Sequence, residues 1–219
     1  MTRSLTIDRA TADRRLLGAA LGDPASWEPW MAVLRAAFGL PLDEQQQAIF
    51  TAVAGSRTPP ASRVRELWAV IGRRGGKSRV AALIAVYMAT FVRHRLSPGE
   101  KGMVLVLAAS MEQAHVVFDY ALAFLQTSPV LRQEIADSTT SEIRLRNGVV
   151  IAEHSNSFRS IRGRTLLGCV FDEISFWRDD TTATPDTETS TAVLPSLATT
   201  NGMLVGISSP YPKAGLLHT

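Results

Sequence analysis

The chain has 219 residues, of which 46% are hydrophobic, so it can bury the core of one large domain or of two small ones. Its single cysteine, Cys169, excludes an internal disulfide framework and a cysteine-based zinc site. The net charge is +3 and most basic residues are arginines, which permits a nucleic-acid partner without demanding one. The longest apolar run, residues 80–92, is too short to span a bilayer, so we expect a protein of the cytoplasm.

The first forty residues are expected to form short helices that carry no obvious chemistry. Residues 9–21 and 27–38 show helical amphipathicity, and a Gly-Asp-Pro stop separates them. We treat residues 1–40 as an N-terminal helical segment and residues 41–219 as one further domain.

A third helix is expected to begin after Asp43, whose short carboxylate is a good helix cap. Its first turns carry three consecutive amides, Gln45, Gln46 and Gln47. This is more polar amide than a structural helix needs, although a solvated helix face explains two of the three.

Residues 67–89 are the stretch around which the chain is organised, and they read LWAVIGRRGGKSRVAALIAVYMA. A buried strand, a glycine-rich turn and a long apolar helix direct backbone N–H groups and a helix dipole at one point, which suits a phosphate. Lys77 adds a charge there, and Ser78 is the hydroxyl that completes a Mg²⁺ shell in G-x-x-x-x-G-K-[ST] loops. The first glycine falls at Gly72 instead of position 71, so we interpret the loop as a variant. The alternative is a glycine-rich turn with an incidental lysine.

The next elements alternate between strand and helix. A turn at residues 97–99 precedes a continuous apolar strand at 103–110 and a helix at 111–125. This order predicts parallel strands joined by right-handed crossovers. Residues 142–155 contain Asn-Gly between two alternating runs, which predicts a β-hairpin that extends one edge of the sheet.

A second informative strand, residues 166–171, delivers Asp172 and Glu173 at its carboxyl end, where α/β sheets bind their ligands. Alone, such a pair is a weak motif that also fits a solvated strand end. Downstream of a phosphate loop it gains meaning, because nucleotide hydrolysis needs one carboxylate near the metal and another to activate water. We expect Asp172 to hold hydrated Mg²⁺ and Glu173 to polarise the attacking water.

The last part of the chain contains fewer motifs. Residues 178–191 are dense in Thr and Asp and are expected to form a loop, followed by a helix at 192–198. Residues 202–210 predict another buried strand, which ends in Ser208 and Ser209. The histidines His94 and His115 show no partner in the sequence pattern and are expected on helix surfaces.

Together these motifs resemble the ATPase domain of the large terminase subunit of tailed bacteriophages, the motor that pumps DNA into a preformed capsid. The resemblance covers about residues 40–212 and rests on the ordered motifs LPLDEQQQAIF, GRRGGKS, IRG, VFDE and ISSP. It implies an α/β fold with a mostly parallel sheet, a P-loop NTPase of the additional-strand (ASCE) type with an inserted β-hairpin. In that fold another strand lies between the phosphate-loop strand and the Asp-Glu strand.

The resemblance also assigns roles to single residues. Arg73 would sense the γ-phosphate in cis, and Arg162 would reach into a neighbouring subunit's site. For Arg162, a structural salt bridge or a DNA phosphate contact is the alternative; Arg159 and Arg164 fit surface charges or DNA-backbone contacts better. Gln46, or its neighbour Gln45, would read adenine, and Ser208 and Ser209 would couple nucleotide state to DNA. The nucleotide-binding residues would be Gln46, Gly72, Arg74, Gly75, Gly76, Lys77, Ser78 and Asp172, with Ser78 and Asp172 on the metal.

The implied cofactors are ATP and Mg²⁺, and the implied partners are double-stranded DNA, held by its backbone, the portal protein and the small terminase subunit. A homo-oligomeric ring on the procapsid in the host cytoplasm is expected. The chain stops abruptly, which suggests a fragment without the family's C-terminal nuclease, so DNA cutting is not expected. A superfamily 2 helicase fragment is one alternative, although DEIS replaces its DEAD or DExH box. A nucleotide-gated scaffold is another, and Glu173 argues against it.

Overall fold

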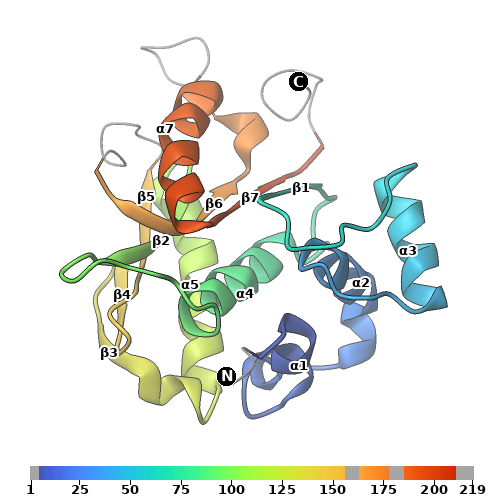
Figure 1. The fold of residues 1–219 in the computed structure, drawn as a ribbon, viewed down its shortest axis with the longest axis horizontal. Coiled ribbons are helices and arrows are strands. Elements are labelled where there is room, and N and C mark those ends of the chain that lie inside the picture. Colours follow the sequence, from blue (N-terminus) through green and yellow to red (C-terminus); the bar gives the residue numbers. More distant parts are fainter. Residues whose placement is uncertain (1–4, 156–162, 178–184, 211–219) are drawn as a thin grey trace.

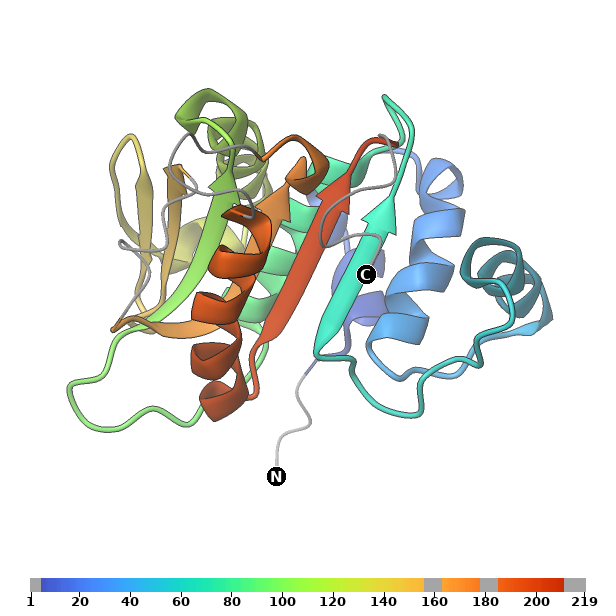
Figure 2. The ribbon, with the colours of Figure 1, turned by 90° about the horizontal axis from the view of Figure 1, so that it is seen from above.

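The computed structural model describes residues 5–155, 163–177 and 185–210. A sheet lies between layers of helices (Figures 1 and 2). Its strands are β1 (Glu66–Val70), β2 (Gly102–Ala108), β3 (Ile135–Ser138), β4 (Glu142–Leu145), β5 (Val150–Ser155), β6 (Thr165–Asp172) and β7 (Met203–Ser208). The α-helices are α1 (Ile7–Ala12), α2 (Glu28–Ala37), α3 (Glu44–Ala54), α4 (Lys77–Thr90), α5 (Met111–Thr127) and α7 (Pro185–Thr200). The 3₁₀ turns are η1 (Leu17–Ala20), η2 (Pro24–Trp27), η3 (Leu131–Glu134) and η4 (Ile174–Phe176).

The sheet has the strand order β1-β7-β6-β2-β5-β4-β3. The first five strands in this order run parallel, which confirms the mostly parallel sheet. β7 lies between β1 and β6, so the additional strand is where the fold class requires it. The predicted hairpin is also confirmed, because β4 pairs antiparallel with β5 at the far edge. The sequence reasoning missed β3, which pairs antiparallel with β4 and forms that edge.

Helices cover the two faces of the sheet differently. α4, α5 and the N-terminal helices share one core on the first face, whereas α7 packs on the opposite face through Val193 and Leu197 (Figure 2). Every α4 residue from Val80 to Ala89 is buried, so this helix is enclosed on all sides. Even so, none of the helices in the described residues is long and apolar enough to cross a membrane.

The helix expected over residues 9–21 is wrong as a single element. α1 ends at Ala12, and η1 begins at Leu17. Between them Asp13 makes a turn in which its carboxylate accepts the Arg15 N–H at 2.7 Å. The chain then folds back so tightly that a Cβ on Gly18 would lie 2.5 Å from the Thr11 carbonyl oxygen, which explains the interruption.

The loop expected over residues 178–191 is wrong from residue 185 onward, because α7 already begins there; residues 178–184 lie outside the described part. Part of the polar beginning of this helix is buried. Ser190 is buried, and Ser196 accepts the Leu166 N–H and donates to the Arg164 carbonyl. These bonds join Ser196, further along the helix, to the beginning of β6.

Candidate nucleotide-binding site

The loop between β1 and α4 has the tight backbone of a phosphate cradle. Gly76, directly before the helix, has φ +77°, and Arg74 has φ +63°, so two residues adopt the left-handed conformation. A Cβ on Gly75 would lie 2.3 Å from the Ile71 side chain. Gly72 has neither constraint, since a Cβ there would meet nothing within 4 Å. The loop therefore needs its second and third glycines more than its first, which accounts for the shifted first glycine.

The loop brings Lys77 against the Asp-Glu pair. Lys77 Nζ lies 3.0 Å from Glu173 Oε1, and the two side chains are 11% and 22% exposed. Glu173 itself has φ +49°, which is uncommon for a residue with a side chain and turns the chain sharply at the end of β6. Two residues identified from separate motifs are thus direct partners at the carboxyl edge of the sheet.

The end of β7 also holds Glu173. The carboxylate accepts hydrogen bonds from the Ser209 N–H at 2.7 Å, the Ser209 hydroxyl at 2.9 Å and the Ser208 hydroxyl at 3.4 Å. Burial on its own would raise the pKa of Glu173, but the donors of Ser209 and Lys77 outweigh it and lower the pKa. This glutamate is therefore an ionised, oriented carboxylate.

Asp172 lies deeper, with 3% of its surface exposed. Its Oδ1 is a buried atom without a hydrogen-bond partner in the described residues. Burial, reinforced by the charge of Glu173, raises the pKa of Asp172 to about 7. An unsatisfied carboxylate oxygen is a hard ligand of the kind Mg²⁺ takes, and Ser78 in the first turn of α4 is a second oxygen donor. This donor set fits the metal that the sequence predicted.

A hollow of about 570 Å³ opens beside Glu173, and Arg73 lines it from the loop. Gln113, in the first turn of α5, lines it too and was missed by the sequence reasoning. The signal that could have found it is position, because a helix that follows a parallel strand begins at the ligand-binding edge of the sheet.

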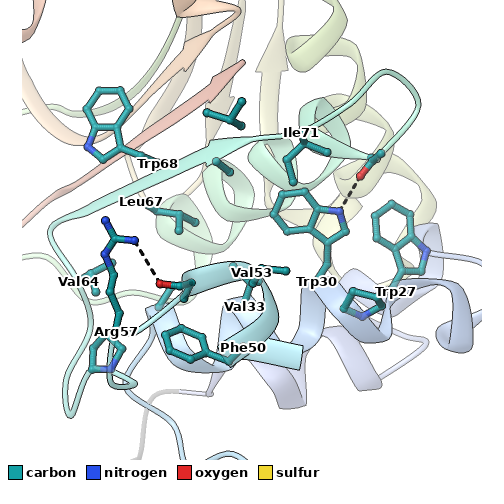
Figure 3. A pocket seen from close by; sticks show the side chains of 18 of the residues that line it. Trp27, Trp30, Val33, Phe50, Val53, Arg57, Val64, Leu67, Trp68 and Ile71 are labelled. Atoms are coloured by element: carbon teal, nitrogen blue, oxygen red, sulfur yellow. Dashed lines mark hydrogen bonds between the residues drawn. The ribbon is translucent and has the colours of Figure 1, made fainter. Parts of the chain in front are cut away.

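A larger cavity, about 850 Å³, lies along β1 toward α2 and α3 (Figure 3). Apolar side chains dominate its walls, among them Trp30, Phe50 and Val53, and it reaches the phosphate loop at Arg74. Asp172 and Glu173, the two carboxylates expected to act in hydrolysis, do not line this larger cavity. Glu173 lines the smaller hollow instead, together with Arg73 and Ser209.

The structure gives the two candidate adenine-reading glutamines other partners. Gln46 forms a capping box with Asp43: its side-chain oxygen accepts the Asp43 N–H, and its own N–H donates to the Asp43 carboxylate. Gln45 donates to the Glu28 carboxylate at 2.7 Å. Neither glutamine lines either of the two cavities. Adenine reading by Gln46 or Gln45 stays a prediction.

Of the three remaining arginines that the sequence analysis named, the structure describes one. Arg159 and Arg162 lie outside the described residues, so the position of the expected trans-acting arginine stays a prediction. Arg164 is described, and its guanidinium lies 3.2 Å from the Met103 sulfur.

The expectation that both histidines lack partners is wrong. His115 Nδ1 lies 2.8 Å from the Glu153 carboxylate, and His94 Nε2 lies 2.9 Å from the Met88 carbonyl oxygen. Asp119, one turn further along α5, lies 3.4 Å from the other nitrogen of His115. The His115–Glu153 pairing joins α5 to β5 and could not be read from sequence spacing.

Comparison with known proteins bears on the fold and the family. Residues 44–204 match the family model described as the terminase large subunit, ATPase domain. The structure is similar to the large terminase ATPase domain of Thermus phage P74-26 and to a mutant of it, with TM-scores of 0.53 and 0.54 and 17% identity. Each match covers 82% of this chain and 69% of the other. The large terminase of bacteriophage HK97 gives a TM-score of 0.51 and 21% identity.

The HK97 match covers 84% of this chain but only 37% of that protein, so this chain spans little more than a third of it. No curated protein matches the sequence. The family model, in contrast, covers well over half of the chain. The chain therefore belongs to the family of terminase large subunit ATPase domains.

Proposed function

We propose that this domain hydrolyses ATP with Mg²⁺ and that, in its full assembly, the hydrolysis drives double-stranded DNA into a viral procapsid. The observation that carries the hydrolytic part is the convergence of three groups at one sheet edge. Lys77 contacts Glu173, and Asp172, with its unsatisfied oxygen, directly precedes that glutamate. A cation for phosphate, a carboxylate for metal and a second carboxylate for water are what phosphoryl transfer to water needs.

Each group would have a separate role. The loop N–H groups, the beginning of α4 and Lys77 would hold the phosphates. Ser78 and Asp172 would hold Mg²⁺, which when bound neutralises charge on the phosphates. Glu173 would accept a proton from the attacking water, oriented by the donors of Ser209. A bound phosphate would compete with Glu173 for Lys77. With nucleotide bound, the hydrogen bonds from Ser209 would therefore be the main contacts that orient the Glu173 carboxylate.

Two arginines would complete the site. Arg73, which shares the hollow with Glu173, would act on the γ-phosphate in cis. Arg162 would come from a neighbouring subunit, so catalysis would need a homo-oligomeric ring, and the isolated domain would be a poor ATPase. Reading of adenine by Gln46 would require that its side chain release the Asp43 N–H.

The parts that handle DNA are proposed from family membership. Ser208 and Ser209 connect Glu173 to β7, which makes them suited to report nucleotide state to DNA-gripping parts. DNA would be held through its phosphates without sequence readout. The portal protein and the small terminase subunit are the proposed protein partners, in the host cytoplasm.

The test is Glu173→Gln, with Glu142→Gln as the matched control. Glu142 is a carboxylate in β4, next to the edge strand β3, and it is paired with Arg144. We expect Glu173→Gln to bind ATP with wild-type affinity in calorimetry but to release phosphate at least about 100-fold more slowly, since general-base catalysis contributes about 10²–10⁴-fold. Glu142→Gln should match the wild type in both assays.

The same assays separate the competing functions. A wild type that binds ATP but releases no phosphate at any protein concentration would favour the nucleotide-gated scaffold. Normal turnover by Glu173→Gln would remove this glutamate from the mechanism. ATP-driven strand separation on a forked duplex would favour the helicase.

A further inference from the structure

A tryptophan of the N-terminal segment contacts the phosphate loop. The indole N–H of Trp30, in α2, donates to the Gly75 carbonyl oxygen at 2.8 Å, across 45 positions of sequence. Figure 3 shows this bond beside Trp27. Trp30 is 8% exposed, so water competes little for the bond. A residue outside the glycine-rich motif thus holds the backbone of the loop.

This bond fixes the orientation of one peptide plane. In a trans peptide the carbonyl and the following N–H point in opposite directions. Holding the Gly75 carbonyl toward Trp30 therefore directs the Gly76 N–H away from the indole. Because glycine stands on both sides of this peptide, no Cβ restrains rotation of the plane. A single hydrogen bond, which favours one state over another by roughly 2- to 13-fold, then has a large influence on this N–H.

Trp27 supports the same peptide by packing. A Cβ on Gly76 would lie 3.0 Å from the Trp27 ring, so the indole is in close contact with this position. Trp27 is itself fixed, since its N–H donates to the Leu21 carbonyl oxygen at 2.8 Å. The Arg79 guanidinium, from the first turn of α4, lies 5.2 Å from the centre of the same ring. The ring is therefore held between the N-terminal segment and α4.

We propose that Trp30 is a positioning residue of the nucleotide site, which presents the Gly76 N–H to a phosphate by anchoring the Gly75 carbonyl. The proposal rests on the proposed function, because it names what shapes the phosphate loop of that site. It makes the N-terminal helical segment part of the nucleotide site. A loop that already has its binding conformation loses less freedom when the ligand arrives, so the anchor increases affinity without a direct contact.

The first experiment needs no nucleotide. Trp30→Phe keeps an aromatic ring and removes the donor. Trp68→Phe is the matched control, because the Trp68 indole lies on β1 and donates to the exposed Glu66 carboxylate at 2.9 Å. Amide hydrogen exchange across residues 72–80 should accelerate by about 2- to 13-fold in Trp30→Phe and stay unchanged in Trp68→Phe. Unchanged exchange in a folded Trp30→Phe overturns the proposal.

A second variant covers the case in which Trp30→Phe does not fold. Trp27→Phe removes the ring atoms that lie closest to Gly76, and it should accelerate exchange in the same residues. Wild-type exchange at residues 72–80 in a folded Trp27→Phe would count against anchoring from the N-terminal segment.

The second experiment measures ATP affinity by calorimetry with Mg²⁺ present. Trp30→Phe should bind ATP about 2- to 13-fold more weakly than the wild type, and Trp68→Phe should bind it equally well. Equal affinity of Trp30→Phe and wild type overturns the positioning role. If the wild type and the control both fail to bind ATP, the proposed function fails, whereas the exchange experiment still decides whether Trp30 anchors the loop.

Discussion

The side-chain nitrogen of Lys77 lies 3.0 Å from a carboxylate oxygen of Glu173, so the residue expected to bind phosphate and the residue expected to activate water are partners. The pair joins the beginning of α4 to the end of β6. Ser209 then ties the same carboxylate to the end of β7. The ends of α4, β6 and β7 thus meet at the carboxylate of Glu173. A change in the partners of this carboxylate therefore changes the contacts of all three elements.

Lys77→Ala should abolish ATP binding. The variant removes the charge that a phosphate would use, and charge-assisted hydrogen bonds of about 1.5–3 kcal/mol each correspond to a loss of up to about 100-fold per bond. Calorimetry with Mg²⁺ and ATP measures the affinity of the variant for ATP. Lys101→Ala, an exposed lysine beside β2, is the control and should bind as the wild type does. Undiminished affinity of Lys77→Ala would disprove the phosphate-loop assignment.

Ser209→Ala should shift the acid side of the pH–rate profile. A general base acts when ionised, so activity falls as the pH drops through its pKa. The Ser209 hydroxyl lies 2.9 Å from Glu173 and lowers the pKa of that carboxyl. Without the hydroxyl the pKa rises, and the acid limb of kcat/KM moves to higher pH. Ser141→Ala, in the turn directly before β4, should leave the acid limb in place. An unmoved acid limb in Ser209→Ala would contradict the role of its hydroxyl.

Substitutions at Arg74 test the loop backbone. Its φ of +63° is reached easily by glycine and with difficulty by a β-branched residue. Arg74→Val should therefore weaken ATP binding and lower the urea unfolding midpoint. The expected loss in the free energy of unfolding is about 1–3 kcal/mol. Arg74→Gly should keep the wild-type midpoint within about 1 kcal/mol. Urea unfolding compares the two, and equal behaviour would show that the left-handed backbone at this position is not required.

Local signals in the sequence were sufficient for most of the fold. The continuous apolar strands, the glycine loop before Lys77 and the Asn-Gly hairpin depend on neighbours in sequence, and the structure has all of them. The contact of Lys77 with Glu173 was not predicted, but it agrees with one further rule, that parallel strands place their carboxyl ends at one edge of the sheet.

What the sequence could not predict depends on contacts between distant segments. The bond from Trp30 to Gly75 and the pairing of His115 with Glu153 have no spacing that signals them. The polar beginning of α7 was interpreted as loop, because nothing in the local pattern signals that Thr189 and Ser190 are buried. In each case tertiary contacts decide the environment of the residue.

Arg162 should act across a subunit boundary, and mixing mutants tests it. Arg162→Ala alone should hydrolyse ATP at least about 10³-fold more slowly, as expected for a lost arginine finger. Mixed with Glu173→Gln it should regain activity, because the second variant supplies the missing arginine to a site with an intact glutamate. Arg73→Ala mixed with Glu173→Gln is the control and should stay inactive, since Arg73 acts in its own site. Absence of rescue at every protein concentration would favour a cis or structural role for Arg162.

The His115–Glu153 pair should make stability depend on pH. A hydrogen bond to Glu153, with the charge of that carboxylate, raises the pKa of His115 above its ordinary value of 6.5. A raised histidine pKa stabilises the fold fully below the unfolded pKa, and this contribution is lost as the pH rises through the folded value. His115 is 45% exposed, so solvent screens the effect and it should be small.

Urea unfolding between pH 5.5 and about 8.5 measures this contribution. The stability difference between wild type and His115→Gln should be largest at the acid end and should shrink as the pH rises. Glu153→Gln is the matched variant, because it keeps the histidine and removes the charge beside it. The His115 pKa, followed by NMR, should fall in Glu153→Gln. A difference between wild type and His115→Gln that does not change with pH would show that the pair is not charged in the folded protein.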